Sequence, residues 1–542
     1  TELSRVERLF LMGASEGTPL GETYGRTRVS GQVIWSTKFL ENRNVSTTTT
    51  TTSVEGGKGT SQSGTQTTTE TVVSYDYSIS LALALGEGEV TRVGRVWADG
   101  AEISTKGLNM RVYPGTEDQM PDPKIEAVEG AGQAPAYRGT AYIVFEDLKL
   151  EKFGNRVPQF SFEVLRPARP AGSDAPKDIA DMVRAVALVP GTGEYALATQ
   201  KVNYARGLGK TTSANVNSPA KRPDFRVAAE ALREEVPGVT SALVVVSWFG
   251  DDLRAGDCTV QPKVEQTAND GIEMKWRVSG TNRSAASVIP AVDGRPVYGG
   301  TPADLSVVQA ITHLRDRGIG PVFYPFILMD QLDGNALPNP LDGSVGQPGL
   351  PWRGRITTSL AAGLAGSPDG TAAAEAEVDA FFGSAHRNDF SWNGKTVSYS
   401  GPNEWSYRRF ILHYAHLCAA AGGVDAFCIG SEMRGLTRIR GAGNSFPAVQ
   451  KLRALAADVR AILPDAKITY AADWSEYFGY HPQDGSGDVF FHLDPLWADD
   501  AIDIVAIDNY VPLSDWRDGV EHLDADWGSI YNLDYLKANI LG

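Results

Sequence analysis

The sequence predicts a multidomain protein in which a mostly-β module is followed by an (α/β)8 barrel. Its 542 residues exceed what one hydrophobic core usually serves. The first part contains runs of alternating β-branched and aromatic residues, as expected for strands. From Ser241 onward, continuous apolar runs alternate with amphipathic helical patterns, which is typical of a parallel sheet covered by helices. We therefore expect a mostly-β module at 1–167, a transitional helical and β segment at 168–240, and a barrel at 241–542.

The β module is expected to hold several strands around one unusual tract. Strand-like patterns occur at residues 24–41, 73–85, 94–100, 110–123, 140–146 and 160–165. Residues 46–71 are rich in Thr, Ser and Gly, with six consecutive threonines at 47–52 and no hydrophobic residue between Val54 and Val72. This tract cannot bury enough apolar surface to fold alone, so we expect the tip of a long β-hairpin or a loop. A disordered loop fits the composition equally well.

In the transitional segment, helices are expected at 177–187 and 226–235. The barrel strands are expected at residues 242–248, 321–328, 426–430, 468–472 and 502–507, which are continuous apolar runs. Helices with apolar residues at spacings of three and four are expected from 301, across 407–418, and from 445. A complete barrel needs eight strands. The missing ones lie either in the Gly/Pro-rich stretch 329–370 or beyond Gly542, and we favour the second, so the barrel is expected to be incomplete in this chain.

Composition excludes several classes of function. The net charge of −16 and the absence of a basic cluster argue against sequence-specific nucleic-acid binding. The three cysteines, Cys258, Cys418 and Cys428, form no CxxC pair, so we expect no disulfide framework, no metal site and no cofactor. His413 and His416 are expected on a helix surface. No signal-peptide pattern occurs and no apolar run approaches the ~18 residues of a transmembrane segment; because the chain starts at Thr1, we expect its natural start to be processed or longer.

Carboxylates and aromatic residues gather where the expected barrel strands end. Glu432 directly follows the apolar run 427–429 and Gly430-Ser431. Functional residues of this fold lie at the carboxyl ends of its strands. Aromatic rings stack on sugars, and paired carboxylates hydrolyse glycosidic bonds. The candidate catalytic residues are Glu432, with Glu476 and Asp508 as possible partners, and the candidate glycan-binding residues are Trp248, Asp251, Trp474 and Tyr510.

A purely structural reading of these residues stays open. Asp and Asn side chains cap the helices that follow barrel strands, and aromatic residues fill the barrel mouth. Packing or capping is the favoured role for Asp251 and Asp473. A single carboxylate with no located partner meets only part of what an active site requires.

Several long motifs resemble a known family. YGRTRVSGQVIWST, GRVWADG, RVYPGTEDQMPDP, PAYRGTAYIVFEDL and FGNRVPQFSFEV resemble the hub region of long-tailed phage baseplate proteins. SWFGDDLRAGDCTV, FCIGSEMRGL, TYAADWSEYFGY and DIVAIDNYVPLSDW resemble the TIM-barrel-like domain of gene transfer agents, which are phage-like particles made by alphaproteobacteria. The resemblance covers about 20–167 and 240–516 and is to the central baseplate (hub) protein of such an agent.

The resemblance implies a homotrimer at the distal tail tip of a virion-like particle, made in the bacterial cytoplasm. Its partners would be other tail baseplate proteins and a cell-surface or cell-wall glycan. The barrel would resemble retaining glycoside hydrolases, whose acid/base Glu follows strand four and whose nucleophile follows strand seven. Glu432 matches the first position; the second is expected beyond Gly542. Ser431 departs from the family pattern, because many such hydrolases have Asn there.

Two functions follow as expectations. The first is a structural baseplate component that closes the tail tube, contacts the cell envelope during DNA delivery, and carries a barrel that recognises or cleaves surface glycan. In this reading recognition without turnover is favoured over hydrolysis. The alternative is a free-standing retaining glycoside hydrolase with an accessory β domain.

Overall fold

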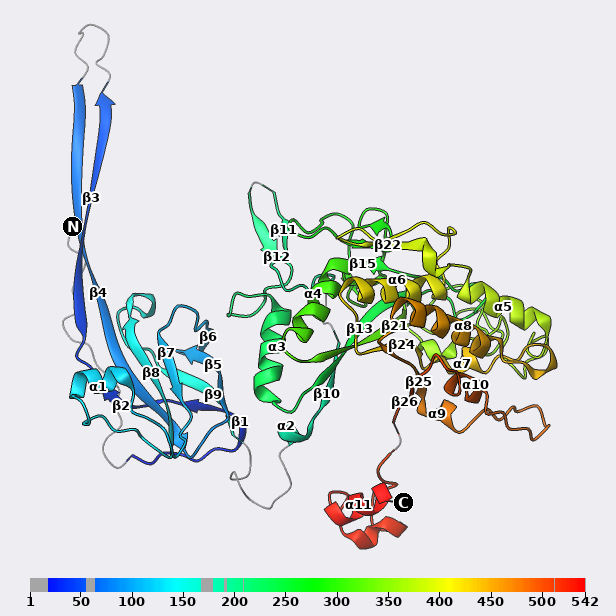
Figure 1. Cartoon of the computed structure of the whole chain (residues 1–542). Helices are drawn as coiled ribbons and strands as arrows, with labels where there is room; N and C mark the ends of the chain where they lie inside the picture. The colour runs from blue at the N-terminus through cyan, green and yellow to red at the C-terminus, as the bar shows by residue number, and fades with distance from the viewer. Residues whose placement is uncertain are drawn as a thin grey trace. The chain divides into compact units, whose positions relative to one another are not determined.

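The computed structural model describes residues 18–54, 64–166, 179–189, 193–207, 209–510 and 512–541. The chain divides into two compact units (Figure 1). Unit 1 comprises Thr1–Val183, Ser218–Arg222 and Glu230–Gly238, and unit 2 comprises Arg184–Asn217, Pro223–Ala229 and Val239–Gly542. The three-part division at 167 and 240 stays a prediction. None of the helices in the described ranges is both long and apolar enough to cross a membrane.

Unit 1 is mostly β, as predicted, and consists of two antiparallel sheets. One has the strand order β2 (Gln32–Ser36), β4 (Gly64–Glu87), β8 (Thr140–Lys149) and β7 (Met110–Tyr113), with β3 (Leu40–Val54) also paired to β4. The other has the order β1 (Gly25–Ser30), β9 (Phe160–Arg166), β5 (Arg92–Ala98) and β6 (Ala101–Ile103). Both sheets contribute to one apolar core that includes Leu81, Ile143 and Phe162. Helix α1 (Pro123–Glu129) is capped by the buried carboxylate of Asp122.

The Thr/Ser/Gly-rich tract is for the most part paired strand. β3 and β4 pair antiparallel from Leu40 opposite Ser78 to Val54 opposite Gly64, and residues 55–63 lie outside the described residues. Threonine favours extended backbone because its side chain branches at Cβ. The other partners of β4 begin only at Ser78, so β3 and β4 form a two-stranded arm beyond the sheet (Figure 1).

Unit 2 is built on six parallel strands that follow one another in chain order. They are β10 (Ala185–Leu188), β13 (Ser241–Gly250), β21 (Gly320–Met329), β24 (Ala426–Ser431), β25 (Lys467–Asp473) and β26 (Ile504–Asp508). Side chains that include Val245, Tyr324, Cys428 and Ala471 pack together on one face of this sheet. The five predicted barrel strands are confirmed, and the sheet is part of a barrel.

β10 was not predicted. The helix expected at 177–187 is wrong: α2 (Ile179–Met182) is a single turn, and Ala185–Leu188 pairs in parallel with β13. Four small and apolar residues carry too little periodicity to separate a strand from a helix. Within 330–370, which the structure describes in full, the only regular element is the 3-10 turn η2 (Arg353–Arg355), so this stretch holds no barrel strand.

The helix predicted across 407–418 is confirmed, and those predicted from 301 and 445 begin slightly later, at Asp304 and Pro447. Ser406 caps α6 (Tyr407–Ala420), and Pro447 opens α8 (Pro447–Ile462). His413 is wrongly predicted as surface, because α6 packs against neighbours on several sides; its Nε2 lies 3.0 Å from Asp304 Oδ1, and both side chains are fully buried. His416 is also covered, with Nε2 2.8 Å from the Arg387 carbonyl. The other helices of unit 2 are α4 (Asp304–Arg315), α5 (Ala372–Phe382), α7 (Arg434–Thr437), α9 (Trp474–Tyr477), α10 (Asp494–Trp497) and α11 (Leu533–Leu541). Helix α3 (Asp224–Glu235) has residues in both units.

Short strands and turns complete the loops. The minor strands are β11 (Asn203–Ala205), β12 (Thr211–Ser213), β14 (Val260–Gln261), β15 (Lys263–Val264), β16 (Arg277–Val278), β17 (Thr281–Asn282), β18 (Ser287–Val288), β19 (Ala291–Val292), β20 (Arg295–Pro296), β22 (Phe390–Trp392) and β23 (Val397–Tyr399). The remaining 3-10 turns are η1 (Glu151–Phe153), η3 (Arg387–Asp389), η4 (Ala442–Asn444) and η5 (Leu523–Trp527). Cys418 and Cys428 are buried thiols, as predicted, and Cys258 is buried too.

Candidate functional site

The carboxyl ends of the parallel strands bring the candidate acids to one edge of the sheet. β24 and β25 pair with an irregularity between Cys428 and Ser431, and β25 pairs with β26 up to Asp473 opposite Asp508. Counted from β10, β24 is the fourth parallel strand, so Glu432 follows strand four. This is the position that the resemblance implied for an acid/base Glu.

Glu432 is held in an uncommon backbone conformation. Its φ is 49°, in the left-handed region that non-glycine residues seldom occupy, and its N–H donates to the Ala471 carbonyl at 2.8 Å. Its side chain is 11% exposed. Oε2 accepts a hydrogen bond from Trp352 Nε1 at 3.0 Å and lies 2.9 Å from Arg353 Nη2. The carboxylate is thus fixed by two residues of the loop that precedes and enters η2.

Arg353 is buried and engages the whole end of β24. Its Nε donates to the Ser431 carbonyl at 2.9 Å, and its Nη2 donates to Ser431 Oγ at 2.8 Å. Its guanidinium lies 3.7 Å from the centre of the Phe326 ring. Ser431, which departs from the family pattern, therefore accepts two hydrogen bonds from the arginine that pairs with Glu432.

Asp508 is the acid that the structure brings beside Glu432. The pKa of Asp508 is raised to about 6, mainly by burial and also by the negative charge of Glu432. A hydrogen bond from Tyr324 Oη to Oδ2 at 2.7 Å and the charge of Arg353 act in the opposite direction. The site therefore combines a carboxylate paired with a guanidinium and a carboxyl group that retains its proton at higher pH than an ordinary aspartate.

Glu476 does not face this site. It is 1% exposed and completes the capping box of α9, where its Oε2 accepts from the Asp473 N–H at 2.9 Å. Its Oε1 accepts from Thr437 Oγ1 at 2.6 Å and from Tyr470 Oη at 3.2 Å. Burial raises the pKa of Glu476 to about 7. The structure does not support the catalytic role predicted for Glu476, because its carboxyl group caps the start of the helix that follows β25.

A cavity of about 440 Å³ opens beside Glu432. It is lined by Trp352, Glu432, Arg434, Asp473, Trp474, Ser475 and Tyr510. The exposed fractions of Trp352, Trp474 and Tyr510 are 37%, 40% and 71%, so part of each residue is open to solvent. Exposed aromatic rings beside the Glu432 carboxylate are an arrangement that suits a sugar ring. We call this space the mouth cavity.

Two predicted glycan-binding residues lie elsewhere. Trp248 is fully buried on β13, and its Nε1 donates to Tyr414 Oη at 3.0 Å, so no ring face is free to stack on a sugar. Both carboxylate oxygens of Asp251 are used by Thr259, from its N–H at 2.7 Å and its hydroxyl at 2.6 Å. The structure therefore does not support glycan binding by either residue, and for Asp251 it agrees with the packing role favoured from the sequence. Asp473 caps α9, which confirms its predicted capping role.

Trp352, Arg353 and Tyr324 belong to the site but were missed. The segment around Trp352 and Arg353 is rich in Gly and Pro and has no periodicity to place it. Tyr324 lies inside β21, two residues before Phe326, and a strict alternation of facing residues along that strand could have indicated it. In the described residues, no group of three or more His, Cys, Asp or Glu side chains is arranged to hold a metal ion.

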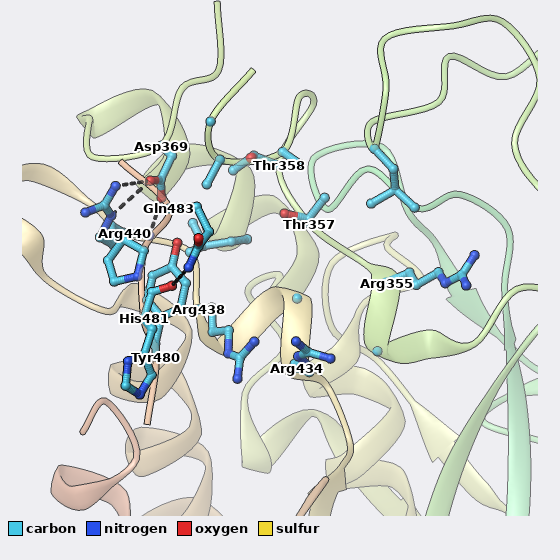
Figure 2. Close-up of a pocket in the computed structure, with 18 of the residues that line it drawn as sticks. Arg355, Thr357, Thr358, Asp369, Arg434, Arg438, Arg440, Tyr480, His481 and Gln483 are labelled. Atoms are coloured by element: carbon cyan, nitrogen blue, oxygen red, sulfur yellow. Dashed lines mark hydrogen bonds and ion pairs between the residues drawn. The ribbon is translucent and has the colours of Figure 1, made fainter. Parts of the chain in front are cut away.

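A larger cavity of about 840 Å³ adjoins the mouth cavity and shares Trp352 and Arg434 with it (Figure 2). Its polar lining includes Arg355, Arg438 and Arg440. We call this space the arginine cavity. The two cavities together give the barrel end an extended polar and aromatic surface.

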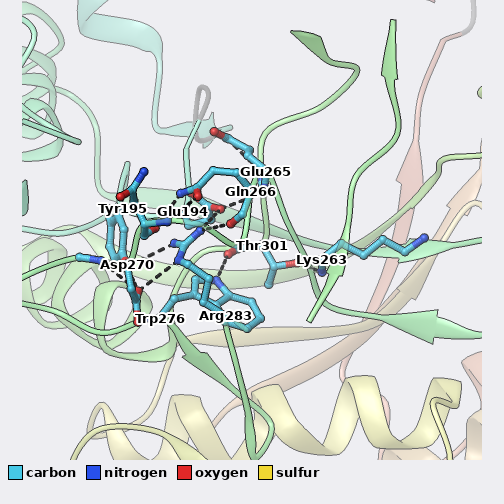
Figure 3. Close-up of polar contacts among 12 residues, drawn as sticks. Glu194, Tyr195, Lys263, Glu265, Gln266, Asp270, Trp276, Arg283 and Thr301 are labelled. Carbon is cyan, nitrogen blue, oxygen red and sulfur yellow. Dashed lines mark hydrogen bonds and ion pairs between the residues drawn. The ribbon is translucent and has the colours of Figure 1, made fainter. Parts of the chain in front are cut away.

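A second polar cluster lies in the loops after β10 and β13 (Figure 3). Arg283 Nη1 lies 2.9 Å from Glu194 Oε1, and these side chains are 2% and 1% exposed. Arg283 Nε lies 3.1 Å from Asp270 Oδ1, which also accepts from Tyr195 Oη at 2.8 Å. Because these groups satisfy one another, the cluster fixes the loops and offers no open site.

Breaking this cluster tests its structural role. Arg283→Met should lower the free energy of unfolding of unit 2 by about 3 kcal/mol, because it leaves the buried Glu194 carboxylate without its partner. Denaturant unfolding followed by tryptophan fluorescence measures the change. The matched control is Arg277→Met: Arg277 is 41% exposed and 3.8 Å from Asp270, so its loss should cost less than about 1 kcal/mol. Equal effects of the two variants would contradict the assignment.

The raised pKa of Asp508 makes a pH prediction. The folded state binds this proton below about pH 6, whereas an unfolded aspartate binds it only below about pH 4. The ionised carboxyl therefore disfavours the folded state above pH 6, and this cost disappears as the pH falls towards 4. Asp508→Asn should gain stability relative to the parent chain at pH 7.5, and the gain should shrink at pH 5.

Asp503→Asn is the control for that experiment. A backbone hydrogen bond from Ile468 and the charge of Arg460 lower the pKa of Asp503, so this group is ionised in both states at pH 5 and at pH 7.5. Its effect on stability should be the same at both pH values. A pH-independent effect of Asp508→Asn in denaturant unfolding would show that Asp508 titrates normally.

Comparison with known proteins places the chain in a family. Residues 405–542 match the family model of the GTA TIM-barrel-like domain, where GTA denotes gene transfer agent. A chain in the solved virion of a native gene transfer agent particle is 33% identical; the match covers 59% of this chain and 76% of that chain, with a TM-score of 0.25. No curated protein matches the chain.

Glycoside hydrolases are also similar, at low level. A GH113 β-1,4-mannanase complex is 16% identical over 58% of this chain and 62% of that chain, with a TM-score of 0.26. The GH113 β-mannanase of Alicyclobacillus acidocaldarius in complex with ManMIm is 15% identical over 66% and 67%, with a TM-score of 0.29. These values carry no argument about the activity of this chain. The 33% identity to the virion chain and the match to the domain model confirm the family that the motifs resemble. The chain belongs to the gene transfer agent proteins that have the GTA TIM-barrel-like domain.

Proposed function

We propose that this protein is a baseplate hub component of a gene transfer agent tail, and that its barrel recognises glycan at the cell envelope. The observation that carries the proposal is the 33% identity to a chain of a native particle, over 76% of that chain. A family member built into particles needs surfaces for assembly and a surface for the recipient cell. Unit 1 is the candidate for the assembly surface, and the barrel end of unit 2 is the candidate for the surface that meets the recipient cell.

The assembly role rests on unit 1. Hub proteins match the symmetry of the tail tube, so we propose a homotrimer at the distal tail tip that closes the tube and contacts other baseplate proteins. The arm of β3 and β4 supports this proposal, because it extends beyond the sheet and offers backbone groups to a neighbour. An isolated two-stranded arm is only marginally stable in water, so it gains from a partner chain.

The glycan role rests on the mouth cavity. Trp352, Trp474 and Tyr510 present ring faces around Glu432, and sugars stack on such faces. Recognition is favoured over hydrolysis, since the Glu432 carboxylate is already engaged by Arg353 and Trp352. If cleavage occurs, the pKa of Asp508, raised to about 6, suits it as a proton donor beside Glu432.

The alternative is a free-standing retaining glycoside hydrolase with an accessory β domain. Mass spectrometry of purified particles separates the two proposals. The baseplate proposal expects the protein in particles at a trimeric copy number. Presence in soluble extract alone would contradict it, and six copies per particle would contradict the trimer.

The arm gives a separate prediction. Replacing residues 47–71 by Asn-Gly keeps Ser46 opposite Val72 and closes the shortened hairpin with a two-residue turn. The unit 1 core should stay folded, because its buried residues begin only at Tyr77 on β4. Yield of gene-transferring particles should fall. Normal yield with normal folding, measured by circular dichroism, would show that the arm is dispensable.

The mouth cavity gives another prediction. Trp474→Ala should weaken glycan binding by about 1 kcal/mol, roughly fivefold in Kd, through loss of a stacking face. The control is Tyr531→Ala, since Tyr531 is 84% exposed and does not line the cavity. Binding of oligosaccharides to the full chain by calorimetry is the measurement. If Trp474→Ala and Tyr531→Ala behave alike, the sugar binds elsewhere.

Glu432→Gln tests chemistry in the same cavity. It keeps the size of the side chain and removes the charge that pairs with Arg353. If particles release sugar fragments from envelope glycan, this variant should abolish the release. Unchanged release would exclude Glu432 from catalysis.

A further inference from the structure

The arginine cavity is a positively charged space in an acidic protein. Four arginines line it, Arg355, Arg434, Arg438 and Arg440, against the two carboxylates of Asp369 and Asp484. The chain as a whole has a net charge of −16. The arginine cavity is therefore locally positive in a chain that is negative overall, which indicates a specific role for these guanidinium groups.

Both carboxylates are already used by one arginine. Arg440 Nη2 lies 2.7 Å from Asp369 Oδ2, and Arg440 Nη1 lies 2.9 Å from Asp484 Oδ2. Within the part of the chain that the structure describes, no carboxylate forms an ion pair with Arg355, Arg434 or Arg438. Three guanidinium groups of the cavity thus have no ion-pair partner among the described residues; Glu476 and Asp473 act on Arg438 only at longer range.

The positions of Arg434 and Arg438 bring two like charges close together, which is unfavourable. They stand four residues apart at the start and end of α7, where two like charges repel by a few tenths of a kcal/mol. Figure 2 shows their guanidinium groups near each other. Burial and the charge of Arg434 lower the pKa of Arg438. An anion between the two groups would reverse this repulsion.

Arg438 also has an unsatisfied donor. Its Nη2 donates to the Ser475 carbonyl at 2.7 Å, and its guanidinium lies 5.5 Å from the centre of the Tyr480 ring. Its Nε is buried and has no hydrogen-bond partner among the described protein groups. A buried N–H without a partner is costly, and in proteins such groups usually face a ligand or water.

The cavity continues from the mouth cavity, because Trp352 and Arg434 line both. A glycan chain stacked on the mouth aromatics would reach the arginines with its next units, and Tyr480 offers a further ring. Guanidinium groups bind carboxylate and phosphate oxygens in a bidentate manner. On these grounds we infer that the arginine cavity binds the acidic substituents, carboxylate or phosphate, of a glycan held at the mouth cavity; the inference rests on the proposed glycan function.

A glycan fits these observations better than a nucleic acid. Nucleic-acid binding needs an extended basic surface that neutralises many phosphates. The cationic residues here are confined to one cavity of about 840 Å³. They can meet a few acidic groups on a chain that aromatic residues hold in place.

The test compares acidic and neutral glycans on the full chain. Calorimetry is run with oligogalacturonate, with a phosphorylated manno-oligosaccharide, and with a cello-oligosaccharide of equal length. At least one acidic probe should bind about tenfold more tightly than the neutral one, and high salt should remove the difference. The two acidic probes separate carboxylate from phosphate recognition. Equal affinity for acidic and neutral probes overturns the inference and leaves the glycan function standing.

Variants locate the effect. Arg355→Gln and Arg438→Gln should each lower the affinity for the acidic probe about tenfold and leave the affinity for the neutral probe unchanged. The control is Arg295→Gln, an exposed arginine outside both cavities. Because Arg438→Gln removes the hydrogen bond to Ser475, the exposed Arg355 provides a variant with little risk to folding. If Arg355→Gln and Arg438→Gln lower the affinity for the acidic probe no more than Arg295→Gln does, the inference is overturned.

Two other outcomes are decisive. A single-stranded DNA of the same charge that binds as tightly as the acidic glycan would show a general polyanion site and overturn the glycan assignment. If no glycan binds, neutral or acidic, both the proposed function and this inference fail. If glycans bind in a way that depends on Trp474 but not on the charge of the glycan, the inference fails and the proposed function stands.

Discussion

The buried guanidinium of Arg353 is the interaction on which the barrel end depends. It comes from η2, far from β24 in sequence, and binds the Ser431 carbonyl, the Ser431 hydroxyl and the Glu432 carboxylate while resting on the Phe326 ring. A buried arginine is tolerable only with such partners, and removing one side of a buried pair usually costs about 3–5 kcal/mol. The same contacts offset the strain of the left-handed backbone at Glu432. They also bring Trp352, the neighbour of Arg353, to the mouth cavity.

Arg353 and its neighbours place Glu432 and Asp508 in different electrostatic environments. Glu432 pairs with the guanidinium, whereas Asp508 sits between the Tyr324 hydroxyl and the negative charge of Glu432. Two neighbouring carboxyls of one site thus have different surroundings, and the pKa of Asp508 is raised to about 6. The arrangement suits a binding site, in which both groups hydrogen-bond sugar hydroxyls, as well as it suits an acid for cleavage. The proposed baseplate role requires the first property alone.

Much of the fold follows from the sequence, because apolar runs and turn residues mark β13, β21, β24, β25 and β26 directly. The strand ends then place Glu432 and Asp508 together, as parallel strands present their carboxyl ends at one edge. Trp248 was misplaced although alternation could have corrected it: Leu243 and Val245 pack on the inner face of the sheet, so Trp248 must face the helices. Glu476 was misplaced although Asp473 and Glu476 form the spacing of a capping box. Arg353 and Trp352 could not be predicted, because only the folded path of an irregular loop brings them to β24.

The most direct test of the account is an electron cryomicroscopy map of intact particles incubated with the acidic oligosaccharide that binds the full chain. The account predicts that the protein lies at the distal tail tip and that sugar density lies against Trp352, Trp474 and Tyr510, extending towards Arg355 and Arg438. A mouth cavity covered by another particle protein, or sugar density at a different place on the particle, would contradict it.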